Sequence, residues 1–336
     1  MKKTLSIVLV VVMLTAILAI PAAADDTYTL NFASTFAADS DRNNQVELVL
    51  KDKLFEKSDG RIVLEIFNSG TLAGNKDMLE ALTSGIADMG IFLTPMYQGQ
   101  FPYSDLFSIP GLNYGTIAET DEVVRAYTEA FPDELFETDL KIGVRYSIGT
   151  QCIISLDPVT TAADVKGLTL RAASSGLPFY EALGAAGVSM AAADVYEGLK
   201  LGTINATVTG MEGTKRNKLA EVADYIVPVP CHNGEEMICM SRAAYDNLPE
   251  DLQAVVDETF VEMYDILSTY TQEQEDLCYD ACYDMNPDLT VNEFSEEELA
   301  AMEELGMELM EAKAAELDGM GLDGTGALNW LKDHAK

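Results

Sequence analysis

The chain has 336 residues, 48% of them apolar and 8% aromatic, which is typical of a folded protein too long for one ordinary core. Its 56 Asp and Glu residues against 21 Lys and Arg residues give a formal net charge of −35 at pH 7. The length predicts two lobes. The net negative charge makes nucleic acids and anionic lipids poor partners, because like charges repel each other.

The first 24 residues have the pattern of a secretory signal peptide. Lys2 and Lys3 form a basic start, residues 5–20 are apolar, and three alanines at 22–24 form a small-residue cleavage site. The apolar run is close to the minimum length for crossing a bilayer, so an uncleaved N-terminal anchor is the alternative. No cysteine stands at the cleavage site for lipid attachment, and a periplasmic location is expected.

Strands are expected to alternate with helices in the first half of the mature chain. This order is typical of a mainly parallel sheet covered by helices. The expected strands are 28–34, 61–67 and 86–93, and the expected amphipathic helices are 43–58, 75–85 and 120–131.

A second unit of alternating strands and helices is expected after residue 141. The segment 141–156 is long enough to pass from one lobe into the next. Further strands are expected at 167–173, 188–190 and 204–210, with helices at 175–187, at 194–202 and from Thr214 onward.

The last third is expected to be mostly helical. Residues 224–241 predict a strand, a turn and a second strand, and residues 248–285 predict one helix with Pro249 in its first turn. A helix of roughly thirty residues spans ~45 Å, so it would brace both lobes. A last helix is expected over 295–321, beginning with a capping box of Ser295 and Glu298.

These elements predict two α/β domains joined by several chain crossings. After the signal peptide (1–24), domain I is expected over 25–150 and is completed by about 240–280. Domain II is expected over 151–239 and is completed by about 281–336.

Catalytic and metal-binding motifs are scarce. The chain has only two histidines, and it has no Gly-rich phosphate loop, nucleophile elbow, paired CxxC or HExxH. Cys278 and Cys282 share a helical face, but no histidine lies near them in the sequence, so ordinary buried thiols are expected. Acidic residues are so frequent that no catalytic carboxylate pair stands out. Neither a cofactor nor a metal is therefore expected.

Arg171 is the polar residue whose position suggests a ligand. It ends the strand "GLTLR" on the face opposite Leu168 and Leu170. In open α/β sheets ligands lie outside the carboxyl ends of the strands, and a guanidinium fork matches a carboxylate bidentately. The alternative is an edge arginine paired with a surface acid.

Several segments, in order and spacing, resemble the extracytoplasmic solute-binding proteins of TRAP transporters, the DctP-type receptors. They include "FNSGTLAGNKDMLEALTSGIADMG", "FPYSDLFSIPGL" and the block "VTTAADVKGLTLRAASSGLPFYEALGAAGVSMAAADVYEGLKLGTINATVTGMEGTKRNKLAEVADYIV". The similarity runs from about Tyr28 to Asp257. It implies a two-domain periplasmic binding protein fold, each domain a mainly parallel sheet flanked by helices, with a long bracing helix.

The resemblance also implies a function and a set of contacts. The chain is expected to be a monomeric receptor rather than an enzyme, and to deliver a small organic acid to the membrane subunits of a TRAP transporter. Arg171 falls where the family holds the solute carboxylate. Many similar proteins have Pro, Trp and Glu where this chain has Gly210, Met211 and Glu212, so the identity of the solute does not transfer. The other candidate contacts are Arg145, Met211, Glu212, Phe36, Tyr97, Asp39, Asn75 and Phe179.

Two other functions compete with this reading. One is a secreted hydrolase using a carboxylate pair, and the other is a sensor that uses the same hinged trap without transport. The scarcity of histidine and the absence of a metal-binding motif favour binding over catalysis.

Overall fold

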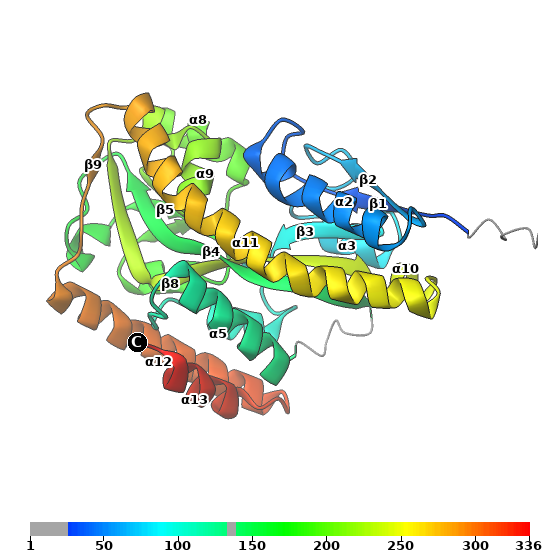
Figure 1. Ribbon diagram of the computed structural model, residues 1–336. Coiled ribbons are helices and arrows are strands. Elements are labelled where there is room, and N and C mark those ends of the chain that lie inside the picture. The colour runs from blue at the N-terminus through cyan, green and yellow to red at the C-terminus, as the bar shows by residue number, and fades with distance from the viewer. Residues whose placement is uncertain (1–25, 133–138) are drawn as a thin grey trace, which may run out of the picture.

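The computed structural model describes residues 26–132 and 139–336; the predicted signal peptide lies outside the described residues. The described strands form one nine-stranded sheet in the order β2-β1-β3-β8-β4-β7-β5-β6, with β9 paired to β8 (Figure 1). The strands are β1 (Tyr28–Ala33), β2 (Ile62–Phe67), β3 (Met89–Leu93), β4 (Leu140–Ser155), β5 (Thr169–Arg171), β6 (Ala186–Val188), β7 (Ala206–Thr209), β8 (Tyr225–Ser241) and β9 (Thr290–Val291).

Helices cover this sheet, as the alternating pattern predicts. The α-helices are α2 (Leu48–Lys57), α3 (Met78–Thr83), α4 (Pro102–Phe107), α5 (Ile117–Ala130), α7 (Leu177–Ala182), α8 (Val195–Lys200), α9 (Met211–Arg216), α10 (Arg242–Asp246), α11 (Glu250–Met285), α12 (Glu296–Gly319) and α13 (Gly324–His334). Short 3-10 or π turns are η1 (Asn43–Glu47), η2 (Thr94–Met96), η3 (Ala162–Val165), η4 (Ala192–Asp194) and η5 (Leu219–Glu221).

The sheet has two parallel ends and an antiparallel centre. β1 pairs in parallel with β2 and β3, and β5 pairs in parallel with β6 and β7. The long strands β4 and β8 run antiparallel to each other and belong to both ends of the sheet. The expected α/β fold class is confirmed, and the long strand expected at 141–156 is the crossing between the two ends.

The turn expected within residues 224–241 is wrong, because these residues form the single strand β8. Gln151 pairs with Val229 whereas its neighbour Thr150 pairs with Asn233, so residues 230–232 bulge out of the ladder. Pro230 has no N–H to donate to the ladder, which favours an irregularity at this point. Because β4 pairs with β8 on both sides of the bulge, the chain continues in one direction.

Three smaller differences from the expected elements are local. The helix expected at 175–187 ends at Ala182, because residues 186–188 pair with β5 as β6. The short segment Pro102–Phe107 is helical although no helix was expected there. The helix α13 was also not expected; it packs its buried face on α4, α5 and α12.

The long helix expected after Pro249 is α11, which has 36 residues and so spans roughly 54 Å. It contacts α2 near the first end of the sheet and α9 near the second, and crosses β4 between them (Figure 1). Ser295 accepts a hydrogen bond from the backbone N–H of Glu298 at the start of α12, as the capping pattern predicts. Helix α11 therefore braces both ends of the sheet.

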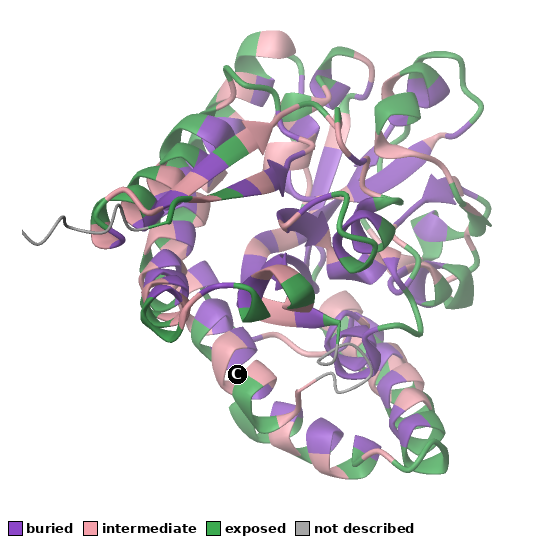
Figure 2. Cartoon of the chain, turned by 90° about the vertical axis from the view of Figure 1, so that its right-hand side faces the viewer, coloured by how far each residue is buried: buried purple, intermediate pink, exposed green. Residues whose placement is uncertain are grey.

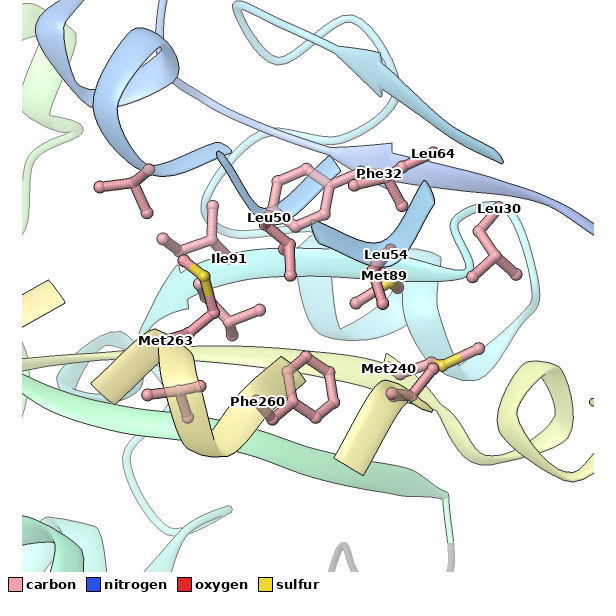
Figure 3. Close-up of a cluster of buried hydrophobic side chains, with 14 of the residues drawn as sticks. Leu30, Phe32, Leu50, Leu54, Leu64, Met89, Ile91, Met240, Phe260 and Met263 are labelled. Atoms are coloured by element: carbon pink, nitrogen blue, oxygen red, sulfur yellow. The ribbon is translucent and has the colours of Figure 1, made fainter. Parts of the chain in front are cut away.

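Apolar side chains fill both ends of the sheet, and the strands lie buried in the middle of the molecule (Figure 2). At the first end, Phe32 and Met89 of the sheet pack against Leu50 of α2 and Phe260 of α11 (Figure 3). A separate cluster at the second end includes Cys278 and Cys282, which are buried free thiols. Across the described residues, no group of three His, Cys, Asp or Glu side chains is arranged to hold a metal ion.

A search of the described helices finds none with the length and apolar character needed to cross a membrane.

Candidate functional site

A pocket enclosing about 750 Å³, part of it open to solvent, lies beside the middle of β4 and β8. Residues from both ends of the sheet line it, and most of them follow the ends of strands. From the first end come Leu93, Pro95 and Met96; from β4 and β8 come Ile148, Gln151, His232, Gly234, Glu235 and Glu236; from the second end come Arg171, Ala173, Val208, Thr209, Gly210, Glu212, Gly213 and Arg216.

Arg171 is the buried cation of this pocket. It is the last residue of β5 and is only 8% exposed. Its Nε donates to the carbonyl oxygen of Met190 at 3.2 Å, and no acidic side chain of the described residues forms an ion pair with it. Burial lowers the pKa of the guanidinium below its usual value, although arginine keeps its charge. The two terminal nitrogens are thus left to bind an anion.

His232 lines the pocket as a neutral hydrogen-bond donor. Burial lowers its pKa to about 3, so the ring is uncharged at neutral pH. Its Nδ1 lies 2.8 Å from the hydroxyl of Tyr180, which is fully buried and has no other hydrogen bond to the part of the chain that the structure describes. Because a buried hydroxyl proton needs an acceptor, we assign Tyr180 as the donor to Nδ1. The ring proton then lies on Nε2.

Two buried carboxylates form the wall on β8. Glu235 accepts hydrogen bonds from the hydroxyls of Thr94 and Ser104. Glu236 is paired with the Arg42 guanidinium at 3.1 Å and also accepts from Tyr146. Neutral hydroxyls and one internal arginine therefore hold these two acids in place.

Helix α9 adds Glu212 and Arg216. Glu212 accepts one long hydrogen bond, 3.4 Å, from the hydroxyl of Tyr270. Arg216 is exposed and lies over the Phe36 ring at 4.8 Å. Arg216 and Met96 also line a wider hollow of about 960 Å³, together with Asn75, so this hollow is the mouth of the pocket.

The structure brings some of the predicted contacts together. Arg171 and Glu212 line the pocket, and Asn75 lines its mouth. Phe36 is 2% exposed and lies beneath the guanidinium groups of Arg42 and Arg216.

Other predicted contacts lie elsewhere. Met211 is 4% exposed and packs among apolar side chains, touching only a small neighbouring hollow. Phe179 lines a separate hollow beside α12, and the Tyr97 hydroxyl bonds to the Asn75 carbonyl. Asp39 is exposed and lines none of the hollows found among the described residues.

Arg145 does not reach the pocket. Its side chain is absent from the residues that line the pocket, whereas its neighbour Tyr146 faces Arg42 and Glu236 on the other side of the strand. Arg145 is fully buried next to Tyr264 of α11. The second cation near the pocket is therefore Arg216.

Sequence reasoning missed His232, Arg216, Glu235 and Glu236 as pocket residues. His232 was assigned to a turn, which concealed its place in the middle of a strand. The sequence signal for the last two residues is the pair of adjacent glutamates, Glu235 and Glu236, which directly precedes the apolar end of β8.

The chain belongs to the family described as bacterial extracellular solute-binding protein, family 7 (DctP), whose model matches residues 32–316. The resemblance to TRAP solute-binding proteins is thereby confirmed. Members of this family are receptors for solutes outside the cytoplasm, so the chain is a solute-binding protein and not an enzyme. The expectation that the chain is not an enzyme is confirmed, and the alternative of a secreted hydrolase is not supported.

Similar proteins bind different solutes. The ectoine/5-hydroxyectoine-binding periplasmic protein UehA of Ruegeria pomeroyi is 24% identical over 275 residues, which is 80% of each chain. The 2,3-diketo-L-gulonate-binding periplasmic protein YiaO of Escherichia coli is 26% identical over 61% of this chain and 64% of its own length.

A solved structure has the same fold. It is a TRAP solute-binding protein from a marine metagenome, in complex with 3-hydroxybenzoate and specific for aromatic acids. It superposes with a TM-score of 0.83 at 20% identity, over 92% of this chain and 98% of the other. At this identity the likeness establishes the fold alone.

Proposed function

We propose that this chain captures a small carboxylic acid between its two lobes and delivers it to the membrane subunits of a TRAP transporter. The observation that carries the proposal is Arg171, a buried guanidinium that lines the pocket without an internal ion pair among the described residues. Leaving a buried charge unpaired is costly, so such a side chain is typical of a site that a ligand completes.

The contacts of Arg171 define how a carboxylate would bind. Because the Nε–H of Arg171 donates to the Met190 carbonyl, the two terminal nitrogens remain to donate two parallel hydrogen bonds to the solute carboxylate. His232 lines the same pocket, and its Nε2–H is a further neutral donor beside Gly176. With a formal charge of −35, the whole protein repels anions at long range, so a local, desolvated cation is needed to bind one.

Closure of the two lobes is the step that would enclose the solute. Several contacts between described residues join the two ends of the sheet near the pocket. Lys215 is paired with Asp41 at 3.0 Å, Arg216 lies over Phe36, and the Ser175 N–H donates to the Pro95 carbonyl at 3.3 Å. Opening would break these few contacts, while β4, β8 and α11 stay continuous and act as the hinge.

Location, assembly and delivery complete the proposal. The N-terminal signal would export the chain to the periplasm, where it would act as a monomer and present the closed, loaded form to the transporter. Similar proteins are named for binding ectoine, 2,3-diketo-L-gulonate and aromatic acids, which supports a small organic acid as the solute and leaves its identity open.

The test is a comparison of carboxylates with their uncharged analogues. The mature protein is mixed with 3-hydroxybenzoate, ectoine, galacturonate or pyroglutamate, and with the amide or methyl ester of each. We expect at least one acid to raise the melting temperature and to bind in calorimetry, and its uncharged analogue to bind much more weakly. Equal binding of an acid and its ester, or binding of neutral compounds alone, would overturn the carboxylate assignment.

A further inference from the structure

Three acidic side chains line the pocket beside two arginines. Its lining includes the carboxylates of Glu212, Glu235 and Glu236, against the guanidiniums of Arg171 and Arg216. His232 adds no positive charge, because its low pKa keeps the ring neutral. Glu236 is paired with Arg42, and Glu235 accepts hydrogen bonds from Thr94 and Ser104, so both of these acids are held by internal contacts.

Glu212 is the acid whose internal contacts are weakest. Its one hydrogen bond, from Tyr270, is 3.4 Å long, and no lysine or arginine of the described residues is within ion-pair distance of it. Arg216, four residues further along α9, lies over Phe36 instead, and Lys215 pairs with Asp41. The half-buried carboxylate of Glu212 thus retains the capacity to accept hydrogen bonds from a ligand.

The surroundings of Glu212 favour a positive group over a second anion. Nearby Glu47 is buried, and its pKa is raised to about 7, mainly by desolvation. The neighbouring Arg42 opposes this shift, while the charges of Glu236 and Glu212 add to it. Glu212 and Glu236 therefore lie close enough to Glu47 to disfavour its charge, and a further anion beside them would add to this repulsion.

Arg171 and Glu212 line the same pocket without pairing with each other. Arg171 ends β5, and Glu212 follows the adjacent strand β7, with Thr207 as the strand partner of Arg171. Within the described residues neither has an ion-pair partner of opposite charge. A solute with charges of both signs could satisfy both residues at once.

We infer that the solute of this receptor is zwitterionic: its carboxylate binds Arg171 and a cationic nitrogen group binds Glu212. The inference rests on the proposed function, because it takes the carboxylate at Arg171 as given. Arg171 supplies an observation that does not depend on the acids: it is more than nine-tenths buried, lines the pocket and has no anionic partner among the described residues.

The experiment compares solutes matched in shape and different in charge. The pairs are proline with pyroglutamate and 3-(aminomethyl)benzoate with 3-(hydroxymethyl)benzoate. Straight-chain amino acids of increasing distance between their two charges extend the series, each with the hydroxy acid of the same length. Affinities are measured by calorimetry at pH 7.5 for the wild type, Glu212→Gln, and the control Glu221→Gln. Glu221 is an exposed acid outside the pocket whose carboxylate bonds to Tyr196.

We expect a zwitterion of the series to bind at least tenfold more tightly than its matched anion. Glu212→Gln should remove most of this preference by weakening the binding of the zwitterion, while Glu221→Gln should leave the preference as in the wild type. The inference is overturned if no zwitterion is preferred, or if the preference survives in Glu212→Gln.

These outcomes separate the inference from the proposed function. If plain carboxylates bind best and depend on Arg171, the zwitterion inference fails and the carboxylate receptor stands. If no compound that carries a carboxylate binds, the zwitterion inference and the proposed function are both refuted.

Discussion

Replacing Arg171 with Met would remove the guanidinium and keep an unbranched stem in the same space. In the bound state, the solute carboxylate would then be buried without its partner. Breaking a buried charge pair in this way costs about 3–5 kcal/mol. Since 1.4 kcal/mol corresponds to a factor of ten, affinity should fall by roughly a hundredfold to several thousandfold.

The same substitution should not weaken the unliganded protein. In the free state Arg171 is buried, has no ion pair among the described residues and bonds only to the Met190 carbonyl. Burial lowers the pKa of its guanidinium, which means that the folded state disfavours the charge. The melting temperature of the free Arg171→Met variant should therefore be equal to or higher than that of the wild type.

The assay is calorimetric titration with the best-binding acid, beside thermal unfolding of the free protein. Arg171→Lys should recover only part of the affinity, because one ammonium replaces a planar fork of donors. Arg125→Met is the matched control, since Arg125 pairs with Glu129 on the surface of α5. The reasoning is refuted if Arg171→Met keeps affinity within a few-fold, or if it lowers the stability of the free protein by several kcal/mol.

Three further predictions concern the core, pH and closure. Met211→Trp should lower the free energy of unfolding by about 1–3 kcal/mol through overpacking, and a changed rank order of acids would instead place Met211 in the pocket. The raised pKa of Glu47, about 7, means that its contribution to stability is complete below pH 4.5 and is lost as the pH rises through 7. The free energy of unfolding of Glu47→Gln, measured with urea, should hence equal that of the wild type near pH 4 and exceed it at pH 8 by on the order of 2–3 kcal/mol. Equal free energies at pH 8 would contradict the raised pKa. Lys215→Met removes a half-exposed ion pair with Asp41 that is worth about 0–1 kcal/mol, so the affinity for the solute should fall by up to about fivefold. The control Lys200→Met, outside the pocket, should leave the affinity unchanged. A larger loss in Lys215→Met would show that closure depends on this ion pair.

Periodicity in the sequence was enough to predict most helices and strands, because an amphipathic helix and a buried strand each repeat a local pattern. The position of Arg171 could also be predicted. An arginine that ends an apolar strand in an α/β fold lies at the edge where ligands bind, and this follows from the alternation of side chains along the strand.

Other features depend on contacts that no local pattern encodes. Residues 224–241 contain turn-forming residues, but pairing with β4 on both sides of Pro230 makes them one strand with a bulge. Which side of β4 Tyr146 took depended on where Arg42 lies, and that arginine stands at the start of η1, about a hundred residues earlier.

The pocket itself was decided by tertiary structure. Glu212 and Met211 are adjacent in α9, yet the first lines the pocket and the second packs in the core, because a helix turns successive side chains about 100° apart. The sequence alone determined that a guanidinium stands at a strand end and that the chain has the pattern of a solute receptor. Which acids gather around that guanidinium, and hence which charges a solute must carry, followed only from the packing of α9 and β8 beside β5, because those residues are distant in sequence and meet only in the folded chain.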